Sequence, residues 1–339
     1  MEQIINVERM EQIINLFGAL DENIRLVEQE YGVTIVNRDT ELKIVGEPEQ
    51  VVPAKAVVDA LLALAARGEQ ISQQNVNYVM SLVKDGRQEQ IAQMGKDVIC
   101  MTVRGKQIKA KTLGQQKYVE ALHKNIVTLA VGPAGTGKTY LAVACAVAAF
   151  REKSINRIIL TRPAVEAGEK LGFLPGDLQN KVDPYLRPLY DALDEMLGPE
   201  TVQSYMEKRI IEIAPLAYMR GRTLKSMFLL CDECQNMSIA QHLMILTRLG
   251  EGSKMVLTGD VTQIDLPSPD DSGLERCADI LEGIEDIKVI RLSGADVVRH
   301  KLVGKIITAF EKNKVNEEKK PSQEKQPYNN RGGKPFRKR

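Results

Sequence analysis

Short apolar runs alternate with longer amphipathic segments through the second half of the chain. This alternation, from about residue 115 to residue 310, predicts an α/β fold with a parallel sheet and helices on both faces. The expected strands are the apolar runs 126–131, 158–161, 210–214, 227–231, 255–258 and 287–292. One insertion, 172–188, is rich in Pro and Gly, so we expect a surface loop there and no regular helix.

The first 85 residues carry shorter elements in a different order. They open on a direct repeat, because Met1–Asn6 and Met10–Asn15 have the same sequence, MEQIIN. Two copies are too few for a solenoid, so we treat the repeat as accidental and expect a strand from the second copy only. Further expected elements are a helix at 21–30, strands at 33–36 and 42–45, and helices at 51–66 and 72–84.

This order predicts a small α+β domain over residues 1–85, which resembles the KH-like modules that bind single-stranded RNA. Those modules clamp the nucleotide backbone with a G-x-x-G loop. We expect no such loop between two helices here, and Gly18-Ala19-Leu20-Asp21 matches the motif only in part. RNA contact and a plain packing or oligomerisation role therefore both stay open for this domain.

The apolar run 126–131 leads into the most informative stretch of the chain, Gly132-Pro133-Ala134-Gly135-Thr136-Gly137-Lys138-Thr139. An alanine-rich, helix-forming segment follows it. This is the G-x-x-x-x-G-K-[ST] motif in the strand–loop–helix context that it requires, which disfavours a glycine-rich turn that binds nothing. Such a loop wraps its N–H groups around the phosphates of a nucleotide. Lys138 is expected to reach the β- and γ-phosphates, and the Thr139 hydroxyl to ligate Mg²⁺.

Acidic residues follow a second apolar run, 227–231, at the end of a strand where an α/β sheet presents its ligands. We expect Asp232 to support the Mg²⁺ ion and Glu233 to polarise the attacking water. Two turn residues without function are the weaker alternative in a chain that has a P-loop. After the run 255–258, Gln263 could sense the γ-phosphate, or could serve only in a turn.

The cysteine and histidine side chains do not indicate a separate metal or catalytic site. Cys231 and Cys234 form a C-x-x-C motif, but no second pair accompanies it, so zinc is not expected and both thiols are interpreted as packing residues. The three histidines, His123, His242 and His300, are isolated in sequence and are interpreted as structural.

Composition places the chain among ordinary globular proteins, with 43% hydrophobic and 27% charged residues in 339. No apolar run approaches the roughly 20 residues that span a bilayer, and the N-terminus lacks the pattern of a signal peptide. We therefore expect a cytoplasmic protein with no membrane segment. Five cysteines without framework spacing fit a reducing compartment.

Charge is unevenly distributed, although the whole chain is only +1. Residues 86–112 are interpreted as a basic linker around one strand, 98–103, which is either a solvated connector or a strip that faces nucleic acid. The sheet domain is expected to span 113–312. Residues 313–339 are low in complexity and should be disordered. From Lys325 onward there are six basic residues and no acid, which suits RNA contact by counterion release, or serves solubility alone.

Together these motifs resemble the nucleotide-binding domain of superfamily 1 helicases, through the loop 132–139, the Asp232-Glu233-x-Gln235-Asn236 motif and the Gly259-Asp260-x-x-Gln263 motif. More closely, the chain resembles the bacterial PhoH-like family of ATPases. Further matches to that family lie at 115–122, 161–163, 172–176, 183–191 and 296–300. The resemblance covers nearly the whole chain. It implies a RecA-like P-loop NTPase fold, ATP and Mg²⁺ as ligands, ATP hydrolysis, a cytoplasmic location and a link to RNA metabolism.

By analogy with the helicase motifs, Gln115 would contact adenine, Arg162 would lie near the nucleic-acid path, and Gln263 would couple the nucleotide state to that path. Helicases of this class complete their ATP site with an arginine from a second RecA-like domain, which we do not expect here. The arginine would then come from a neighbouring subunit of a ring-like homo-oligomer, such as a hexamer, or from the same domain. The candidates are Arg299, Arg291 and Arg220.

The resemblance therefore implies an ATP hydrolase that acts on single-stranded or structured RNA, as a helicase or remodelling motor, alone or beside a separate endoribonuclease. The expected catalytic residues are Lys138, Glu233, Gln263 and Arg299. An ATP-gated adaptor that recruits a ribonuclease without translocating is the alternative. A small-molecule kinase is a third possibility, which no lid-like arginine cluster supports.

Overall fold

The computed structural model describes residues 1–87, 91, 97–163, 178–298 and 303. Residues 1–298 form one compact unit. The predicted disordered tail, the first part of the 172–188 insertion, Arg299 and His300 lie outside the described residues. The domain boundaries drawn at residues 85 and 112 stay predictions.

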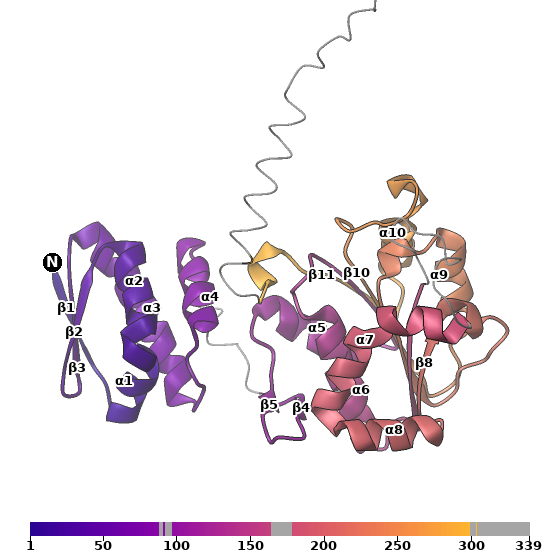
Figure 1. Ribbon diagram of the computed structural model, residues 1–339. Helices are drawn as coiled ribbons and strands as arrows, with labels where there is room; N and C mark the ends of the chain where they lie inside the picture. Colours follow the sequence, from indigo (N-terminus) through magenta and orange to yellow (C-terminus); the bar gives the residue numbers. More distant parts are fainter. Residues whose placement is uncertain (88–90, 92–96, 164–177, 299–302, 304–339) are drawn as a thin grey trace, which may run out of the picture. The chain divides into compact units, whose positions relative to one another are not determined.

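A three-stranded antiparallel sheet and four α-helices make up the N-terminal part of the chain (Figure 1). In chain order the elements are β1 (Glu2–Asn6), α1 (Met10–Phe17), η1 (Ala19–Asp21), α2 (Glu22–Tyr31), β2 (Thr34–Arg38), β3 (Glu41–Val45), α3 (Pro48–Ala66) and α4 (Gln73–Lys84). Strand β3 lies between β1 and β2. Ile5, Ile35, Leu42 and Ile44 point from this sheet into a core shared with the helices, as the two-residue period of a strand requires.

The prediction for the repeated hexapeptide is wrong. The first copy of the MEQIIN repeat forms β1, and the second copy forms the start of α1 instead of a strand. Because α1 is a helix, Gly18-Ala19-Leu20-Asp21 does lie between two α-helices, where a KH-type loop would lie. The loop still departs from G-x-x-G, since Asp21 occupies the last position with a left-handed backbone (φ 59°). RNA contact by this loop stays a prediction.

Six parallel strands form the second sheet, as predicted, and each lies within one residue of its expected bounds. They are β6 (Val127–Val131), β7 (Arg157–Arg162), β8 (Ile211–Pro215), β9 (Met227–Cys231), β10 (Lys254–Gly259) and β11 (Ile287–Arg291). The strand order is β11-β6-β10-β9-β7-β8. All residues of β6 and β9 are buried, because both faces of this sheet are covered.

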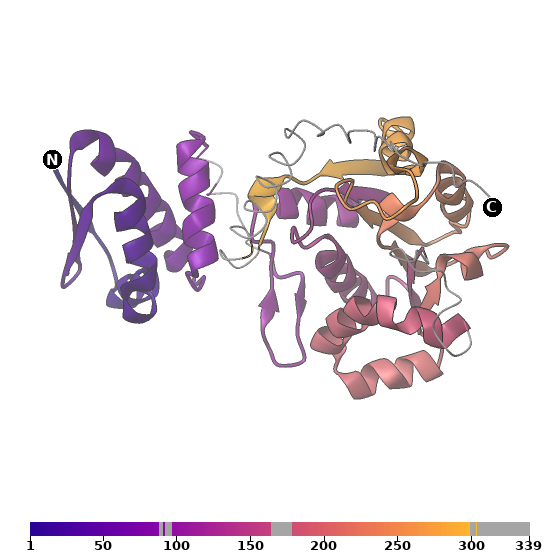
Figure 2. The same ribbon diagram turned by 45° about the horizontal axis from the view of Figure 1, so that its top comes forward.

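Helices cover the two faces of this sheet (Figure 1, Figure 2). One face packs against α5 (Leu113–Lys124), α6 (Lys138–Arg151), α7 (Leu178–Leu197) and α8 (Pro199–Glu207). The other face packs against α9 (Ile239–Leu246) and α10 (Leu274–Leu281). Short 3-10 turns lie at the strand ends and loops: η3 (Leu216–Met219), η4 (Cys234–Asn236), η5 (Pro269–Asp271) and η6 (Gly294–Asp296).

Two further expectations about local structure are corrected. The insertion 172–188 is not a loop throughout, because α7 begins at Leu178 and continues through two prolines. Its buried residues Leu186, Leu189, Leu193 and Met196 form a stripe at helical spacing, and burying that stripe outweighs the proline cost. The expected strand 98–103 is instead a hairpin of two short strands, β4 (Cys100–Met101) and β5 (Gln107–Ile108).

The strand order explains how distant motifs meet. Strand β10 lies between β6, which ends at the Gly-rich loop, and β9, which ends at Asp232. Since all three strands are parallel, their carboxyl ends lie at one edge of the sheet. Among the helices of the described residues, none combines the length and the apolar character needed to cross a membrane.

Candidate nucleotide site

The Gly-rich loop runs from Gly132 to Gly137, between β6 and the first residue of α6, Lys138. Gly135 and Gly137 have positive φ (86° and 81°), which glycine adopts without strain. Gly132 is required for another reason, since a Cβ there would lie 2.7 Å from the carbonyl oxygen of Leu292. The backbone thus has the curvature that a phosphate cradle at a helix N-terminus requires.

Neighbouring segments hold this loop by hydrogen bonds to its backbone. The Ala134 N–H donates to Asp260 Oδ2 (2.6 Å), and Gln115 Nε2 donates to the Thr136 oxygen (3.0 Å). The Val298 N–H donates to the Gly135 oxygen (2.9 Å). These hydrogen bonds fix the shape of the loop from within the protein, and such preorganisation lowers the cost of binding a ligand.

Lys138 lies folded over its own loop. Its Nζ donates to the carbonyl oxygens of Gly132 (2.5 Å) and Pro133 (3.0 Å), and the side chain is buried. From the neighbouring helix α5, Tyr118 donates its hydroxyl to the backbone oxygen of Lys138 (3.1 Å). Burial raises the pKa of Tyr118 well above its ordinary value, so this hydroxyl stays protonated. A bound phosphate would offer Lys138 an anionic acceptor in place of neutral carbonyls.

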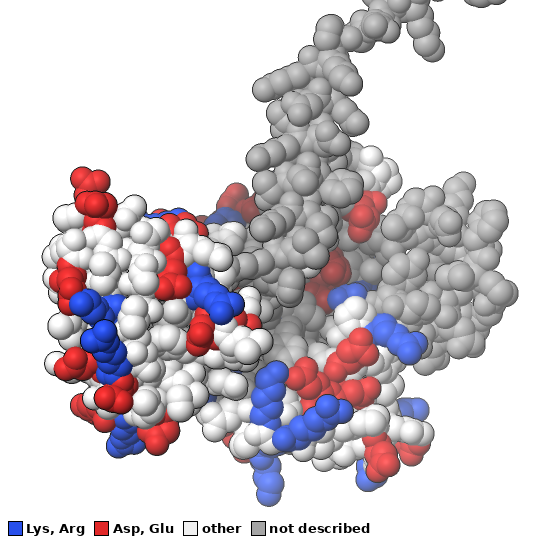
Figure 3. Space-filling view, turned by 60° about the vertical axis from the view of Figure 1, so that its left-hand side comes forward, with Lys and Arg blue, Asp and Glu red and all other residues white. Residues whose placement is uncertain are grey.

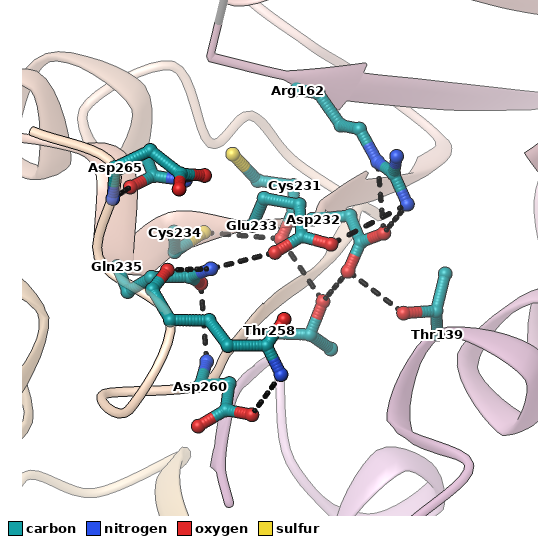
Figure 4. A network of polar contacts seen from close by, with 12 residues as sticks. Thr139, Arg162, Cys231, Asp232, Glu233, Cys234, Gln235, Thr258, Asp260 and Asp265 are labelled. Carbon is teal, nitrogen blue, oxygen red and sulfur yellow. Dashed lines mark hydrogen bonds and ion pairs between the residues drawn. The ribbon is translucent and has the colours of Figure 1, made fainter. Parts of the chain in front are cut away.

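Asp232 is the centre of the polar network in Figure 4. Its Oδ1 accepts hydrogen bonds from Thr139 Oγ1 (2.7 Å) and Thr258 Oγ1 (2.6 Å). Its Oδ2 accepts from Arg162 Nε (3.0 Å) and Nη2 (2.6 Å). The residue is only 3% exposed, so these four hydrogen bonds, and not water, stabilise its carboxylate. The structure thus brings together the two residues predicted to hold the metal, Thr139 and Asp232.

The donor set fits Mg²⁺, which prefers oxygen ligands and usually binds to one or two protein groups plus phosphate and water. The Thr139 hydroxyl donates its hydrogen to Asp232, so its lone pairs remain available to a cation. Within the described parts of the chain, no cluster of three or more His, Cys, Asp or Glu side chains could hold a metal by itself. The residues present would therefore suit a Mg²⁺ ion that is shared with a bound nucleotide.

Glu233 follows Asp232 but faces solvent, with 42% of its side chain exposed. Its backbone is left-handed (φ 58°), an uncommon conformation for a non-glycine residue that often marks functional sites. Its Oε2 accepts a hydrogen bond from Gln235 Nε2 (2.6 Å). This exposed carboxylate is accessible to water, as a water-activating base must be.

The carboxyl end of β10 joins the two halves of the site. Gln263 Nε2 donates to Asp260 Oδ2 (2.9 Å), the same oxygen that accepts from the Ala134 N–H. Gln235 bridges to this segment, since its Nε2 also donates to the Gln263 oxygen (2.9 Å) and its Oε1 accepts from the Asp260 N–H (3.1 Å). In the sequence, Gln235 and Asp260 are only positions of two separate motifs, so their hydrogen bonds to each other and to Gln263 are not predictable from it. Two polar residues after neighbouring strands were the available signal.

Gln115 lies beside the loop, and both ends of its side-chain amide form hydrogen bonds with the protein backbone. Its Oε1 accepts from the Lys111 N–H (2.7 Å), and its Nε2 donates to the loop oxygen of Thr136. The side chain is buried. It holds the loop to the start of α5 in this structure, and a contact with adenine stays a prediction.

The predicted arginine candidates differ in location. Arg299 lies outside the described residues. Arg291, at the edge strand β11, pairs with Glu275 and Asp279. Arg220 follows η3 beyond β8, the opposite edge strand. Arg162, by contrast, contacts Asp232 directly, so an arginine assigned to the nucleic-acid path lies in the nucleotide site.

The thiols of Cys231 and Cys234 are buried packing groups, as interpreted from sequence. Cys234 Sγ donates to the Cys231 oxygen (3.1 Å). Burial raises the pKa of Cys234 well above its ordinary value, because a thiolate would lose its hydration there. The Cys234 thiol therefore stays protonated, and both thiols pack beneath the strand end that carries Asp232.

His242 on α9 is buried and predicts a pH effect on stability. Its Nδ1 donates to the Ser238 oxygen (2.9 Å), and burial lowers its pKa. Below the ordinary His pKa of about 6.5 the unfolded chain binds a proton that the folded chain resists, so stability falls as pH falls.

We expect the urea midpoint to drop between pH 7 and pH 5.5, and to drop less in His242→Gln. The matched control is exposed His123→Gln, which should keep the wild-type pH slope; an unchanged slope in His242→Gln contradicts this account.

A Gly-rich loop before a helix, a lysine at its end and an acidic strand end one strand further along define a P-loop nucleoside triphosphatase fold and site. Residues 107–311 match the family model described as PhoH-like protein, and the chain belongs to this family. It is 49% identical to a PhoH-like protein of Bacillus subtilis over 302 residues, which cover 89% of this chain and 95% of that protein. A PhoH-like protein of Mycobacterium tuberculosis H37Rv is also 49% identical, over 88% of this chain and 84% of that protein.

The protein PhoH of Escherichia coli K12 is 38% identical over 80% of this chain and 75% of its own length. Among solved structures, the chain matches a SWI2/SNF2 ATPase core from Sulfolobus solfataricus in complex with dsDNA at a TM-score of 0.30 and 14% identity, over 53% of this chain and 43% of that one. A likeness of that size carries no argument about this chain.

Proposed function

We propose that the chain is a Mg²⁺-dependent ATPase that acts on RNA. The observation that carries the ATPase part is the direct contact between Thr139 Oγ1 and Asp232 Oδ1, at 2.7 Å, beside the exposed carboxylate of Glu233. It joins the phosphate cradle to the acidic strand end in one site. Those two halves are what phosphoryl transfer needs besides its substrate.

Each residue of the site has a distinct task in this proposal. The loop N–H groups and Lys138 bind the phosphates, for which Lys138 leaves the carbonyl oxygens of Gly132 and Pro133. Thr139 and Asp232 would hold Mg²⁺, which when bound neutralises charge on the phosphates. Glu233 orients a water and accepts its proton. Gln263, linked to the loop through Asp260, responds to the γ-phosphate.

Phosphate release from ATP by the purified full chain tests the ATPase proposal. We expect turnover with Mg²⁺, none with excess EDTA, and a change in rate when single-stranded RNA is added. A wild-type chain that binds no nucleotide and releases no phosphate under any of these conditions would overturn the proposal.

RNA is proposed as the partner because of the tail. On the face seen in Figure 3, acidic and basic side chains are intermingled over the described residues, without a large area of one sign. The sequence after residue 324 is different, with six basic residues and no acid. Since nucleic-acid affinity comes mainly from neutralised phosphates, this segment is the best-suited contact in the sequence.

Two deletions in the tail test the RNA contact. Removing residues 325–339 takes away six positive charges, whereas removing 313–324 takes away three Lys and three Glu and leaves the net charge unchanged. We expect the first to weaken single-stranded RNA binding by roughly tenfold or more at low salt and to flatten its salt dependence, since each phosphate contact contributes a log–log slope of about −0.7. The second should change neither quantity. Equal losses in both variants would show that length, and not charge, matters.

Strand displacement separates a motor from the alternative of an ATP-gated adaptor that recruits a ribonuclease. A motor unwinds an RNA duplex with a single-stranded overhang of one polarity and stops in EDTA. ATP turnover without displacement on either overhang favours the adaptor. The mass of the full chain in solution, with and without nucleotide, tests the proposed ring-like homo-oligomer.

A further inference from the structure

Arg162 is the last residue of β7, the strand adjacent to β9. The backbone joins the two strand ends, since the Asp232 N–H donates to the Thr161 oxygen (2.9 Å). The guanidinium binds Asp232 Oδ2 through Nε and Nη2, and Nη2 lies 3.7 Å from Glu233 Oε1 (Figure 4). Its side chain is only 14% exposed. A positive charge thus lies between the carboxylate that would support the metal and the carboxylate that would activate water.

This contact competes with a metal ion. Asp232 already accepts four hydrogen bonds, and Arg162 supplies the one full positive charge among those four donors. Divalent charge near Thr139 and Asp232 would take over that neutralisation and repel the guanidinium at short range. Arginine stays protonated, so it can respond only by moving. Glu233 is a described acceptor within reach, since its Oε1 lies 3.7 Å from Nη2, and it is the carboxylate to which the proposed function assigns the attacking water.

We propose that Arg162 is the arginine that completes the ATP site from within the same chain. Without Mg²⁺ it neutralises Asp232; when Mg²⁺ and ATP bind, it gives up Asp232 and its guanidinium stabilises negative charge on the transferring phosphoryl group. This inference rests on the proposed ATPase function. If Arg162 completes the site, hydrolysis needs no arginine from a neighbouring subunit, and an oligomer would have a role other than completing the ATP site.

The first test compares Arg162→Ala with Arg162→Lys and with Arg222→Ala as the control. Arg222 also pairs with a carboxylate through two hydrogen bonds, to Glu212 of the edge strand β8 (2.6 and 2.8 Å). We expect kcat to fall about 10³-fold or more in Arg162→Ala, the range of known arginine fingers, with KM within about threefold of wild type. Arg162→Lys should recover only part of the rate, because one ammonium cannot form a bidentate contact. Arg222→Ala should hydrolyse ATP at the wild-type rate.

The second test measures Mg²⁺ binding under conditions in which no ATP is hydrolysed. A fluorescent non-hydrolysable ATP analogue is titrated with Mg²⁺ in wild type and Arg162→Ala. Removing a competitor from Asp232 should lower the Mg²⁺ concentration at half-maximal binding by several-fold. A residue that only holds Asp232 in place would raise that concentration instead, so the sign of the shift decides between the two roles.

The third test mixes Arg162→Ala with Lys138→Ala. If the arginine acts within its own chain, no site in the mixture is complete and activity stays at the level of the separate variants. Recovery of activity on mixing would place the arginine in a neighbouring subunit and overturn the inference. An inactive wild type would contradict the ATPase proposal itself, whereas an active wild type with Arg162→Ala within threefold of it would contradict this inference alone.

Discussion

Replacing Lys138 with alanine is expected to lower the rate of ATP hydrolysis by at least about 100-fold, the usual cost of removing one preorganised charge contact to a transition state. Lys138 is the first residue of α6, directly after the loop, and supplies the positive charge of the motif. Its Nζ donates to the Gly132 and Pro133 oxygens, which lie within the cradle where phosphates would bind. Phosphate release at saturating Mg²⁺ and ATP measures the effect.

Lys117→Ala is the matched control for this variant, because Lys117 is an exposed lysine on α5, the helix that also carries Gln115. It should hydrolyse ATP like wild type. Nucleotide binding should weaken in Lys138→Ala while the thermal unfolding temperature stays close to that of wild type. A Lys138→Ala chain that folds and hydrolyses ATP at the wild-type rate would remove the assignment of the loop.

Replacing Glu233 with glutamine is expected to lower kcat by about 10²–10⁴-fold, the contribution that a positioned general base makes. Glutamine keeps the size of the side chain and can still meet Gln235, but it cannot take a proton from water. Nucleotide binding should persist, because the loop, Lys138 and Asp232 are untouched. Single-turnover phosphate release together with binding of a fluorescent ATP analogue separates the two effects.

The control for this substitution is Glu251→Gln, which removes an exposed carboxylate in the turn before β10. Its kcat should equal that of wild type. If Glu233→Gln instead loses nucleotide binding and turnover together, Glu233 serves to shape the strand end. If it keeps both, another group activates the water.

The nucleotide loop and the acidic pair were predictable because their chemistry is local in sequence. Eight consecutive residues, 132–139, specify a backbone path and its lysine, and Asp232-Glu233 follow an apolar run that can only be buried. The six strands were predictable for the same reason, since each is a short apolar run in an otherwise polar context. Contacts between residues far apart were not predictable. Arg162 meets Asp232 only because β7 and β9 are neighbours in the sheet.

Helix α7 shows the opposite failure, in which a local signal was misleading. Proline and glycine around residues 172–188 indicated a loop, yet the helix begins at Leu178. Proline removes one hydrogen bond and restricts one turn, a local cost. The gain from burying Leu186, Leu189, Leu193 and Met196 against α6 and the sheet is distributed along the helix and depends on packing.

The sequence alone determined the class of the site, because the groups that bind a nucleoside triphosphate are adjacent in the chain or end a buried strand. Tertiary structure decided the rest, and the repeated hexapeptide MEQIIN demonstrates the reason. Its first copy forms a strand in which Ile5 pairs with Leu42 of β3. Its second copy begins a helix that buries Ile13 of the repeat and Leu16 directly after it. Identical local propensities gave two structures because each copy adopted the conformation that buried its apolar side chains against the neighbours available to it.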